Sequence, residues 1–274
     1  MSLVAIVGKT GSGKTAMLSK FLTDTITNNQ ADYRRAKREI LGLQSNGFNN
    51  LELPPQKHIC FSDFDYKLNK RFSSYKIDGY KIGLENKYFK TIKFPVGSSI
   101  FLDEAQRYFD SRMSFFLREE VYRWFQLHRH NDYKVYMTAQ RLANIDVNIR
   151  ALLEKIIVID SLDFQYDEYG FIVKMIWSCH EFTAPDIAEK YQMACESGEK
   201  TTLGKKVTYT YNGNVFNYYN SFSNKFVFYD SSHSKYDLLE YDYYTEQGYC
   251  FTKQGIKDFN TKNYFVAPKG YYKN

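Results

Sequence analysis

The sequence lacks several features that would have narrowed its class at once. Its four cysteines form no Cys-x-x-Cys pair, which argues against a zinc site or a disulfide framework. It has no run of about 18 or more apolar residues, the minimum expected of a membrane-spanning helix. The apolar stretch at residues 3–7 is too short for a signal peptide. We therefore expect reduced thiols in a soluble, cytoplasmic chain with no transmembrane segment.

The sequence also lacks a strong charge bias. Its 37 basic and 31 acidic residues give a net charge of +6, which permits binding to nucleic acid or anionic lipid without indicating either. Hydrophobic residues make up 43% and aromatic residues 18% of the chain, so it has the apolar surface that a folded protein needs. Its 274 residues suit one α/β domain with a smaller C-terminal part.

A glycine-rich loop is the strongest motif that is present. Residues 8–15 match the phosphate-loop pattern G-x-x-x-x-G-K-[ST] in full, between an expected strand and an expected helix. In that setting backbone N–H groups and the helix N-terminus converge on phosphate oxygens. We predict that Lys14 contacts the β and γ phosphates of ATP and that Thr15 is a ligand of Mg²⁺. The predicted nucleotide-binding residues are Gly8, Lys9, Thr10, Gly11, Ser12, Gly13, Lys14 and Thr15.

A second motif is an apolar strand, residues 100–102, that ends in two carboxylates. Asp103 would lie beside the phosphate loop and hold Mg²⁺ through water, and Glu104 would be the general base that polarises the attacking water. A small-molecule kinase stays open as an alternative, although it would need a site for an acceptor. The Asn-Lys-x-Asp motif of GTPases and the Leu-Ser-Gly-Gly signature of transporter ATPases are absent.

Two further residues are candidates for catalysis. Gln140 follows the expected strand at 134–137, so it would lie at the same sheet edge as Asp103 and sense the γ phosphate or orient water. Arg129 is favoured as an arginine finger that acts across a subunit interface, with Arg141 and Arg150 as rivals and a plain surface arginine as the alternative. His128 and its neighbour two residues on do not share a helix face, which argues against a metal pair.

Strands alternate with helices along the first part of the chain. We expect strands at 3–7, 59–61, 99–102, 134–137 and 156–159, helices at 15–27 and 115–128, a surface insertion at 28–57 that carries the basic residues 34–38, and a hairpin within 66–94. This order predicts an α/β fold with a mainly parallel sheet.

The composition changes near residue 185. Of the 25 tyrosines, 14 follow this point, within alternating patches such as 207–211 and 241–244. We expect an ATPase domain at 1–185 and a small, tyrosine-rich, β-rich appendage at 186–274, whose tyrosines are half buried or form a stacking or partner surface.

Residues 1 to about 160 resemble the zonular occludens toxin (Zot) family, the assembly ATPases of filamentous phages, within the wider group of hexameric DNA-pumping ATPases. The resemblance rests on the phosphate loop, on Ile-Phe-Leu-Asp-Glu-Ala-Gln-Arg at 100–107, and on Phe-Gln-Leu-His-Arg-His at 125–130 followed by Thr-Ala-Gln-Arg at 138–141 and Asn-Ile-Arg at 148–150. It implies a RecA-like P-loop NTPase core, and it gives Gln140 the role of γ-phosphate sensor and Arg129 that of the finger.

The resemblance also implies a biological role. Members of this family couple ATP hydrolysis to the movement of single-stranded phage DNA through an envelope assembly complex. They do so as a homo-oligomeric ring such as a hexamer. We therefore expect a viral morphogenesis motor at the inner face of the membrane, with phage DNA and assembly proteins as partners. Family members often carry a membrane-spanning helix, which is missing here, and no toxin activity is predicted. The alternative is a scaffold whose assembly is switched by nucleotide binding.

Overall fold

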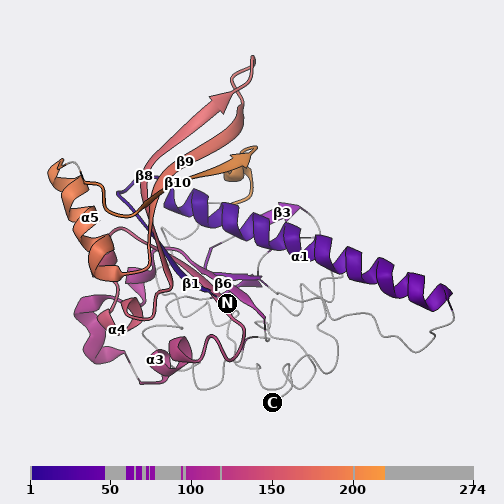
Figure 1. Cartoon of the computed structure of the whole chain (residues 1–274), viewed down its shortest axis with the longest axis horizontal. Coiled ribbons are helices and arrows are strands. Elements are labelled where there is room, and N and C mark those ends of the chain that lie inside the picture. Colours follow the sequence, from indigo (N-terminus) through magenta and orange to yellow (C-terminus); the bar gives the residue numbers. More distant parts are fainter. Residues whose placement is uncertain are drawn as a thin grey trace, which may run out of the picture.

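The computed structural model describes residues 2–46, 60–64, 66–69, 72–73, 75–77, 94, 97–117, 119–199 and 201–219. An eight-stranded sheet in the order β10-β9-β8-β1-β7-β6-β2-β5 forms its centre (Figure 1). The strands are β1 (Ser2–Val7), β2 (Cys60–Ser62), β5 (Tyr75–Lys76), β6 (Ser99–Leu102), β7 (Lys134–Ala139), β8 (Lys155–Tyr166), β9 (Ile172–Phe182) and β10 (Lys205–Asn212).

Most of the sheet is parallel. Each neighbouring pair from β8 across to β5 is parallel, whereas β9 and β10 are antiparallel additions at the other edge. The predicted α/β class with a mainly parallel sheet is therefore confirmed. A separate two-stranded hairpin of β3 (Lys67–Asn69) and β4 (Phe72–Ser73) lies within the predicted hairpin region 66–94, most of which is outside the described residues.

The helix after the phosphate loop is much longer than predicted. Helix α1 runs from Lys14 to Ser45, so the helix does not end at residue 27, and the part of the predicted insertion up to 45 is helical, including the basic residues 34–38. Alanine, arginine, lysine and leucine, which favour helix, are frequent in this second half, and it has no proline. The prediction was wrong because a helix that leaves the core no longer needs an apolar face.

The first half of α1 covers one face of the sheet. Met17, Leu18 and Leu22 are fully buried there and pack with Ile6 of β1 and Phe101 of β6. The second half extends beyond the sheet, as Figure 1 shows at the right of the view. Leu41 and Leu43 near its end are exposed.

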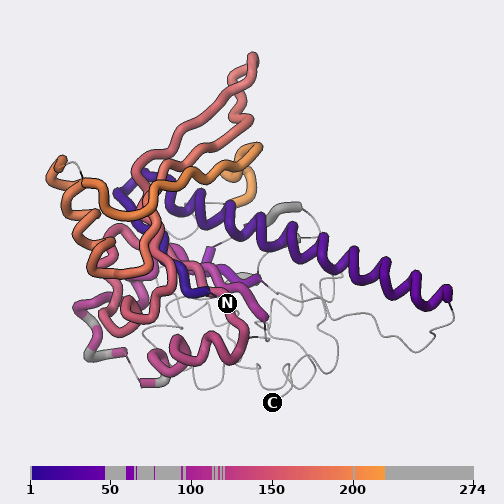
Figure 2. Tube along the Cα trace, viewed as in Figure 1, coloured from indigo at the N-terminus to yellow at the C-terminus, as the bar shows by residue number. Residues whose placement is uncertain are grey.

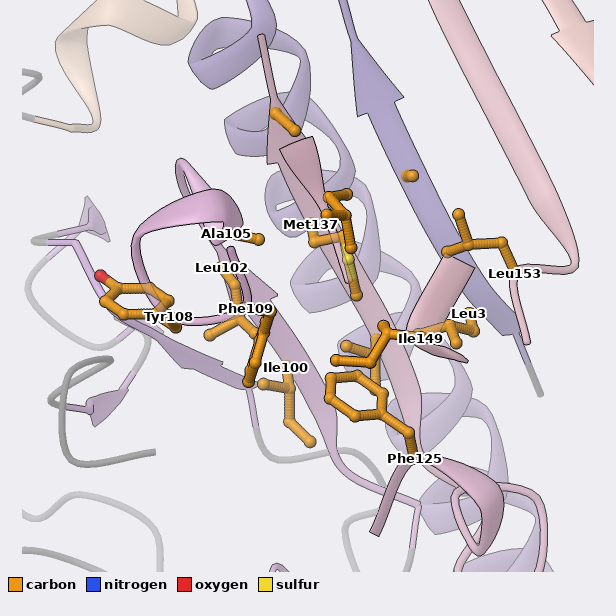
Figure 3. Close-up of a cluster of buried hydrophobic side chains, with 14 of the residues drawn as sticks. Leu3, Ile100, Leu102, Ala105, Tyr108, Phe109, Phe125, Met137, Ile149 and Leu153 are labelled. Carbon is orange, nitrogen blue, oxygen red and sulfur yellow. The ribbon is translucent and has the colours of Figure 1, made fainter. Parts of the chain in front are cut away.

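Short helices cover the opposite face. Helices α3 (Glu119–Gln126) and α4 (Val147–Arg150) and the 3₁₀ turns η1 (Ala105–Arg107) and η3 (Leu142–Asn144) contribute to one cluster with β1, β6 and β7 (Figure 3). Phe109, Phe125 and Ile149 are fully buried within it. The predicted helix at 115–128 is shorter, because a separate 3₁₀ segment at Ser111–Phe116 ends at Leu117, whose backbone is extended.

Strands β8 and β9 form a long hairpin whose outer half extends beyond the parallel strands, at the top of Figure 1. The predicted strand at 156–159 is only the buried first third of β8, whose pairing with β9 continues to Tyr166. The sequence reading ended the strand where buried residues give way to exposed ones, at Asp160.

Helix α5 (Pro185–Ser197) and β10 follow the proposed boundary at 185, and β10 pairs with β9 along its whole length. The alternating patch 207–211 is thus a strand of the main sheet, whereas 220–274, with the patch 241–244, lies outside the described residues. The division at 185 stays a prediction.

Cys60, Cys179 and Cys195 are free thiols, and Cys250 lies outside the described part. No described helix is long and apolar enough to cross a membrane.

Candidate functional site

The order of the strands gathers the candidate residues at one edge of the sheet. Gly8 follows β1, Gln140 follows β7, Asp103 follows β6 and Asp63 follows β2, and these four strands are neighbours in the parallel part of the sheet. Strand β7 lies between the phosphate-loop strand and the strand that ends in the acidic pair. Parallel strands end at the same edge, where ligands of α/β sheets bind.

The phosphate loop has the backbone that its glycines predict. Gly11 and Gly13 have φ values of 82° and 83°, a region that favours glycine, and helix α1 begins directly after Gly13. A Cβ on Gly8 would lie 2.7 Å from the Ser12 hydroxyl oxygen, so only glycine fits there without displacing Ser12. The Ser12 hydroxyl is buried and has no hydrogen-bond partner among the described residues. A phosphate oxygen is the kind of acceptor that would satisfy it.

Lys14 is folded back onto the loop. Its Nζ atom donates hydrogen bonds to the backbone oxygens of Gly8 and Lys9, both at 2.9 Å. Burial lowers the pKa of Lys14, and the carboxylates of Asp103 and Glu104 oppose this shift. The ammonium group is therefore held inside the loop by two carbonyl oxygens, which an arriving anion could replace.

Asp103 lies at the centre of a hydrogen-bond network. Its carboxylate accepts from the Thr15 hydroxyl at 3.0 and 3.1 Å and from the Thr138 hydroxyl of β7 at 2.7 Å. The Thr138 oxygen in turn accepts from the Glu104 backbone N–H at 2.8 Å. Thr138 thus connects the two acidic residues to β7, and the phosphate-loop threonine contacts the acidic pair directly.

Asp63 is a third carboxylate that the sequence reading missed. It is buried after β2, and both of its oxygens accept from the Asp103 backbone N–H, at 2.9 and 3.0 Å. The Tyr108 hydroxyl donates to the same carboxylate at 2.9 Å, and Figure 3 shows this hydroxyl at the outer side of the apolar cluster. Burial, followed by the charge of Asp103, raises the pKa of Asp63 well above its usual value.

The electrostatics of the acidic group follow from its burial. Burial raises the pKa of Asp103, the hydrogen bonds from Thr138 and Thr15 lower it, and the charge of Glu104 raises it. Carboxylates that crowd together in a buried place favour a cation between them or a proton on one of them. The site is thus suited to a cation and an anion bound side by side.

Glu104 has an unusual backbone. Its φ and ψ are both 52°, in the left-handed region that non-glycine residues rarely adopt. Such strain is maintained only where the surroundings enforce it, and here the hydrogen bond to Thr138 and the following 3₁₀ turn do so. The Glu104 carboxylate pairs with the Arg107 guanidinium at 2.5 Å. Its side chain is one third exposed, so water can reach it.

Gln140 is exposed at the end of β7, between the phosphate loop and the acidic pair. Gln192 of α5 contacts the segment that follows β7. Its Oε1 accepts from the Leu142 backbone N–H at 2.9 Å, and its Nε2 donates to the Gln140 backbone oxygen at 3.5 Å. Arg141 forms two hydrogen bonds with Glu196 of the same helix, at 2.9 and 2.6 Å. Helix α5 therefore fixes the loop that presents Gln140.

The three candidate arginines lie in different places. Arg129 precedes β7, at the sheet edge opposite the phosphate loop, and pairs with Glu154 at 2.7 Å. It is thus not brought to the site of its own chain, and a role across an interface stays a prediction. Arg141 lies at the same edge as the phosphate loop, and Arg150 pairs with Glu189. His128 is buried and contacts Glu154.

Trp177 of β9 supports the phosphate loop and was also missed. Its ring is fully buried, and its Nε1–H donates to the Gly13 backbone oxygen at 3.3 Å. A Cβ on Gly13 would lie 2.5 Å from a methyl carbon of Leu162 and 3.2 Å from this nitrogen. No local pattern joins residue 177 to residue 13, so only the antiparallel addition of β9 to the sheet reveals the contact.

The residues fit Mg²⁺ bound together with a nucleotide. The Thr15 hydroxyl and the Asp103 carboxylate are hard oxygen donors about 3 Å apart, and Mg²⁺ in such enzymes takes one or two protein oxygens with phosphate and water. No group of three or more histidine, cysteine, aspartate or glutamate residues in the described part of the chain could hold a metal by itself. Thr15 and Asp103 are the residues that would hold Mg²⁺.

Comparisons with known proteins identify relatives of the whole described region. The family model described as Zonular occludens toxin (Zot) matches residues 2–224. A search of curated proteins found no match.

The solved structures that are similar to this chain include a zonular occludens toxin domain and a viral genome packaging NTPase. The N-terminal domain of zonular occludens toxin from Neisseria meningitidis is 19% identical, with 80% of this chain and 98% of that chain covered and a TM-score of 0.49. The genome packaging NTPase from Sulfolobus turreted icosahedral virus 2, in complex with ATP-gammaS, is 11% identical, with coverage of 80% and 97% and a TM-score of 0.38. Its complex with AMPPCP is 13% identical, with coverage of 77% and 92% and a TM-score of 0.38.

Proposed function

The chain belongs to the zonular occludens toxin family, and from this premise we propose that it is an ATP-hydrolysing motor of viral morphogenesis that extrudes or packages DNA through an assembly complex. The observation that carries the proposal is the contact of the phosphate-loop Thr15 with Asp103, which joins the two nucleotide-site motifs across 88 positions of sequence. This contact supports the ATPase chemistry, whereas the proposed motor role rests on membership of the family.

The proposed chemistry is transfer of the γ phosphoryl group of ATP to water. The N–H groups of the loop and Lys14 bind the phosphates, and Lys14 exchanges its two carbonyl partners for phosphate oxygens. Bound Mg²⁺ would supply positive charge to the phosphate oxygens. Thr15 and Asp103 are the residues that would hold it.

Glu104 is the proposed general base. Water attacks the γ phosphorus, the bond to the oxygen that bridges the β and γ phosphates breaks, ADP leaves and the proton of the water passes to the Glu104 carboxylate. Glu104 must first release Arg107, its partner in this structure. The exposed Gln140 amide, presented by the loop that α5 holds, would orient the attacking water or contact the γ phosphate.

We propose that the chain acts as a homo-oligomeric ring, such as a hexamer, on the cytoplasmic side of the host envelope, with phage DNA and assembly proteins as partners. Single-stranded DNA is the favoured substrate. Arg129 would then complete the nucleotide site of a neighbouring copy, because it lies at the sheet edge opposite the site of its own chain. The exposed fraction of the Arg129 side chain, 64%, leaves it accessible to a neighbour.

The test is steady-state ATP hydrolysis by the full chain, titrated with single-stranded and then double-stranded DNA. Glu104→Gln is the variant, and Glu199→Gln, an exposed glutamate after α5, is the matched control. We expect DNA to stimulate hydrolysis in the wild type and the control, and no hydrolysis in Glu104→Gln. Hydrolysis that requires Glu104 but ignores DNA would contradict the motor and favour the nucleotide-switched scaffold. Hydrolysis unchanged in Glu104→Gln would overturn the assigned base.

A further inference from the structure

Large apolar side chains are exposed at the tip of the β8–β9 hairpin. Tyr166, Tyr169, Phe171 and Val173 have exposed fractions of 59%, 76%, 69% and 44%. The tip projects away from the rest of the sheet, at the top of Figure 1. Exposed aromatic side chains are enriched at interaction surfaces, where a few of them provide much of the binding energy.

The tip is rigid rather than a loose loop. One oxygen of the Asp167 carboxylate accepts from the backbone N–H groups of Tyr169 and Phe171, at 2.9 and 2.8 Å. Gly170 provides the φ of 81° that the turn requires, and backbone hydrogen bonds from Asp167 N–H to the Phe171 oxygen and from Gly170 N–H to the Asp167 oxygen close it. The backbone of the turn is therefore ordered before a partner arrives, which lowers the entropic cost of binding.

The charge of the tip limits the class of partner. Between residues 163 and 174 the hairpin carries the carboxylates of Asp163, Asp167 and Glu168 and a single cation, Lys174. This surface repels the phosphates of nucleic acids and of anionic lipids. Its complement is a surface with cations beside apolar side chains.

The second half of α1 provides such a surface on the chain itself. Arg34, Arg35, Lys37 and Arg38 are exposed there, and none forms an ion pair with another described residue. The exposed Leu41 and Leu43 follow, with exposed fractions of 49% and 44%. Arginine side chains stack on aromatic rings and pair with carboxylates, so they match both kinds of group at the tip.

We propose that the hairpin tip of one copy docks on the second half of α1 in a second copy. Figures 1 and 2 show the two elements leaving the sheet in different directions. The contact joins two different surfaces. A growing assembly therefore keeps one free tip at one end and one free helix at the other until a ring closes. The inference rests on the proposed oligomer and names the surfaces that build it.

Two variants test the contact, since each removes one side. Tyr169→Ser with Phe171→Ser alters the tip, and Arg34→Glu with Arg38→Glu alters the helix. All four side chains are exposed, so folding is expected to persist and is checked by circular dichroism. Lys190→Glu with Met193→Ser, at exposed positions of α5, is the matched control. Masses are measured by mass photometry with and without ATP and Mg²⁺.

We expect the wild type and the control to assemble, and each variant to assemble at least about 30-fold more weakly. An equal mixture of the two variants retains one intact tip and one intact helix, so it should form one-to-one dimers and nothing larger. Full assembly of both variants, or a wild type that stays monomeric in every condition, would overturn the contact. Loss of DNA binding by the helix variant with assembly intact would assign α1 to nucleic acid instead.

The same samples separate this inference from the proposed function. Wild-type protein that assembles through the tip but does not hydrolyse ATP would count against the ATPase and leave the contact standing. If the wild type hydrolyses ATP with DNA stimulation while both variants assemble normally, the ATPase stands and the contact is overturned.

Discussion

Thr138→Val is the substitution that most directly probes the acidic network. Thr138 is fully buried, its hydroxyl donates to Asp103 at 2.7 Å, and its oxygen accepts from the Glu104 backbone N–H at 2.8 Å. Valine has nearly the same shape and suits a strand, so the substitution removes the hydroxyl with little change in packing. The charge-assisted hydrogen bond and the unpaired buried N–H together should lower the free energy of unfolding by about 3 kcal/mol.

The same change should impair hydrolysis more than nucleotide binding. The Glu104 backbone loses the hydrogen bond that helps to enforce its left-handed conformation, and a displacement of about 1 Å can cost about 100-fold in rate. Asp103 also loses a hydrogen bond that lowers its pKa. The acid limb of the activity profile should therefore move to higher pH, because Asp103 becomes protonated at a higher pH than in the wild type.

The measurements are urea unfolding, kcat for ATP hydrolysis from pH 5 to 9, and ATP affinity by calorimetry. Thr138→Ser is the matched control, because it keeps the hydroxyl and loses only a methyl group, at a cost of about 1 kcal/mol. It should retain the wild-type pH profile. A Thr138→Val protein with unfolding free energy within about 0.5 kcal/mol of the wild type and an unchanged kcat would refute the role of this hydroxyl.

Four further outcomes are expected. Lys14→Ala should abolish ATP binding in calorimetry, since it removes the buried cation of the loop; unchanged affinity would exclude the site. Burial raises the folded-state pKa of Asp63, so the folded chain binds more protons than the unfolded chain and the free energy of unfolding falls as the pH rises. Asp63→Asn should make this fall less steep, by up to about 1.4 kcal/mol per pH unit. Equal slopes for the two proteins in urea titrations would contradict this. Because Trp177 contacts the phosphate loop at Gly13, ATP should change its fluorescence, and the change should persist in Trp124→Phe. Loss of the fluorescence change in Trp124→Phe would assign it to Trp124. Gly13→Ala should destabilise the chain in thermal unfolding, since φ is 83° and the new Cβ meets Leu162; an unchanged Tm would contradict the strain.

The sequence was sufficient for most of the parallel core but missed β5, which pairs parallel with β2 inside the region predicted to hold a hairpin. The phosphate loop and the strand that ends at Asp103 carry their own local signals, namely glycines at fixed spacing and an apolar run followed by carboxylates. The family resemblance drawn from these motifs is confirmed by the match to residues 2–224. Helix α1 beyond residue 27 was missed, because its second half has helical propensity but no apolar periodicity that a search for a core-facing helix would find.

The supporting residues of the site could not be predicted in the same way. Asp63 follows the short strand β2 and Thr138 lies on β7, and a single aspartate or threonine carries no motif. Their roles depend on the order in which β2, β6 and β7 lie side by side, which is a property of the whole sheet. Trp177 depends likewise on the pairing of β9 with β8. Burial of a polar group beside an acidic pair becomes visible only when the sheet is assembled.

Helix α5 connects the two regions on which the proposals depend. Gln192 holds the loop that presents Gln140, and its neighbour Tyr191 donates to Asp160 of β8 at 2.8 Å and contacts His180 of β9 at 2.6 Å. Asp160 lies where the register of the β8–β9 pairing shifts, at the point where the hairpin leaves the parallel sheet. Consecutive residues of one helix therefore contact the γ-phosphate side of the proposed site and the base of the hairpin.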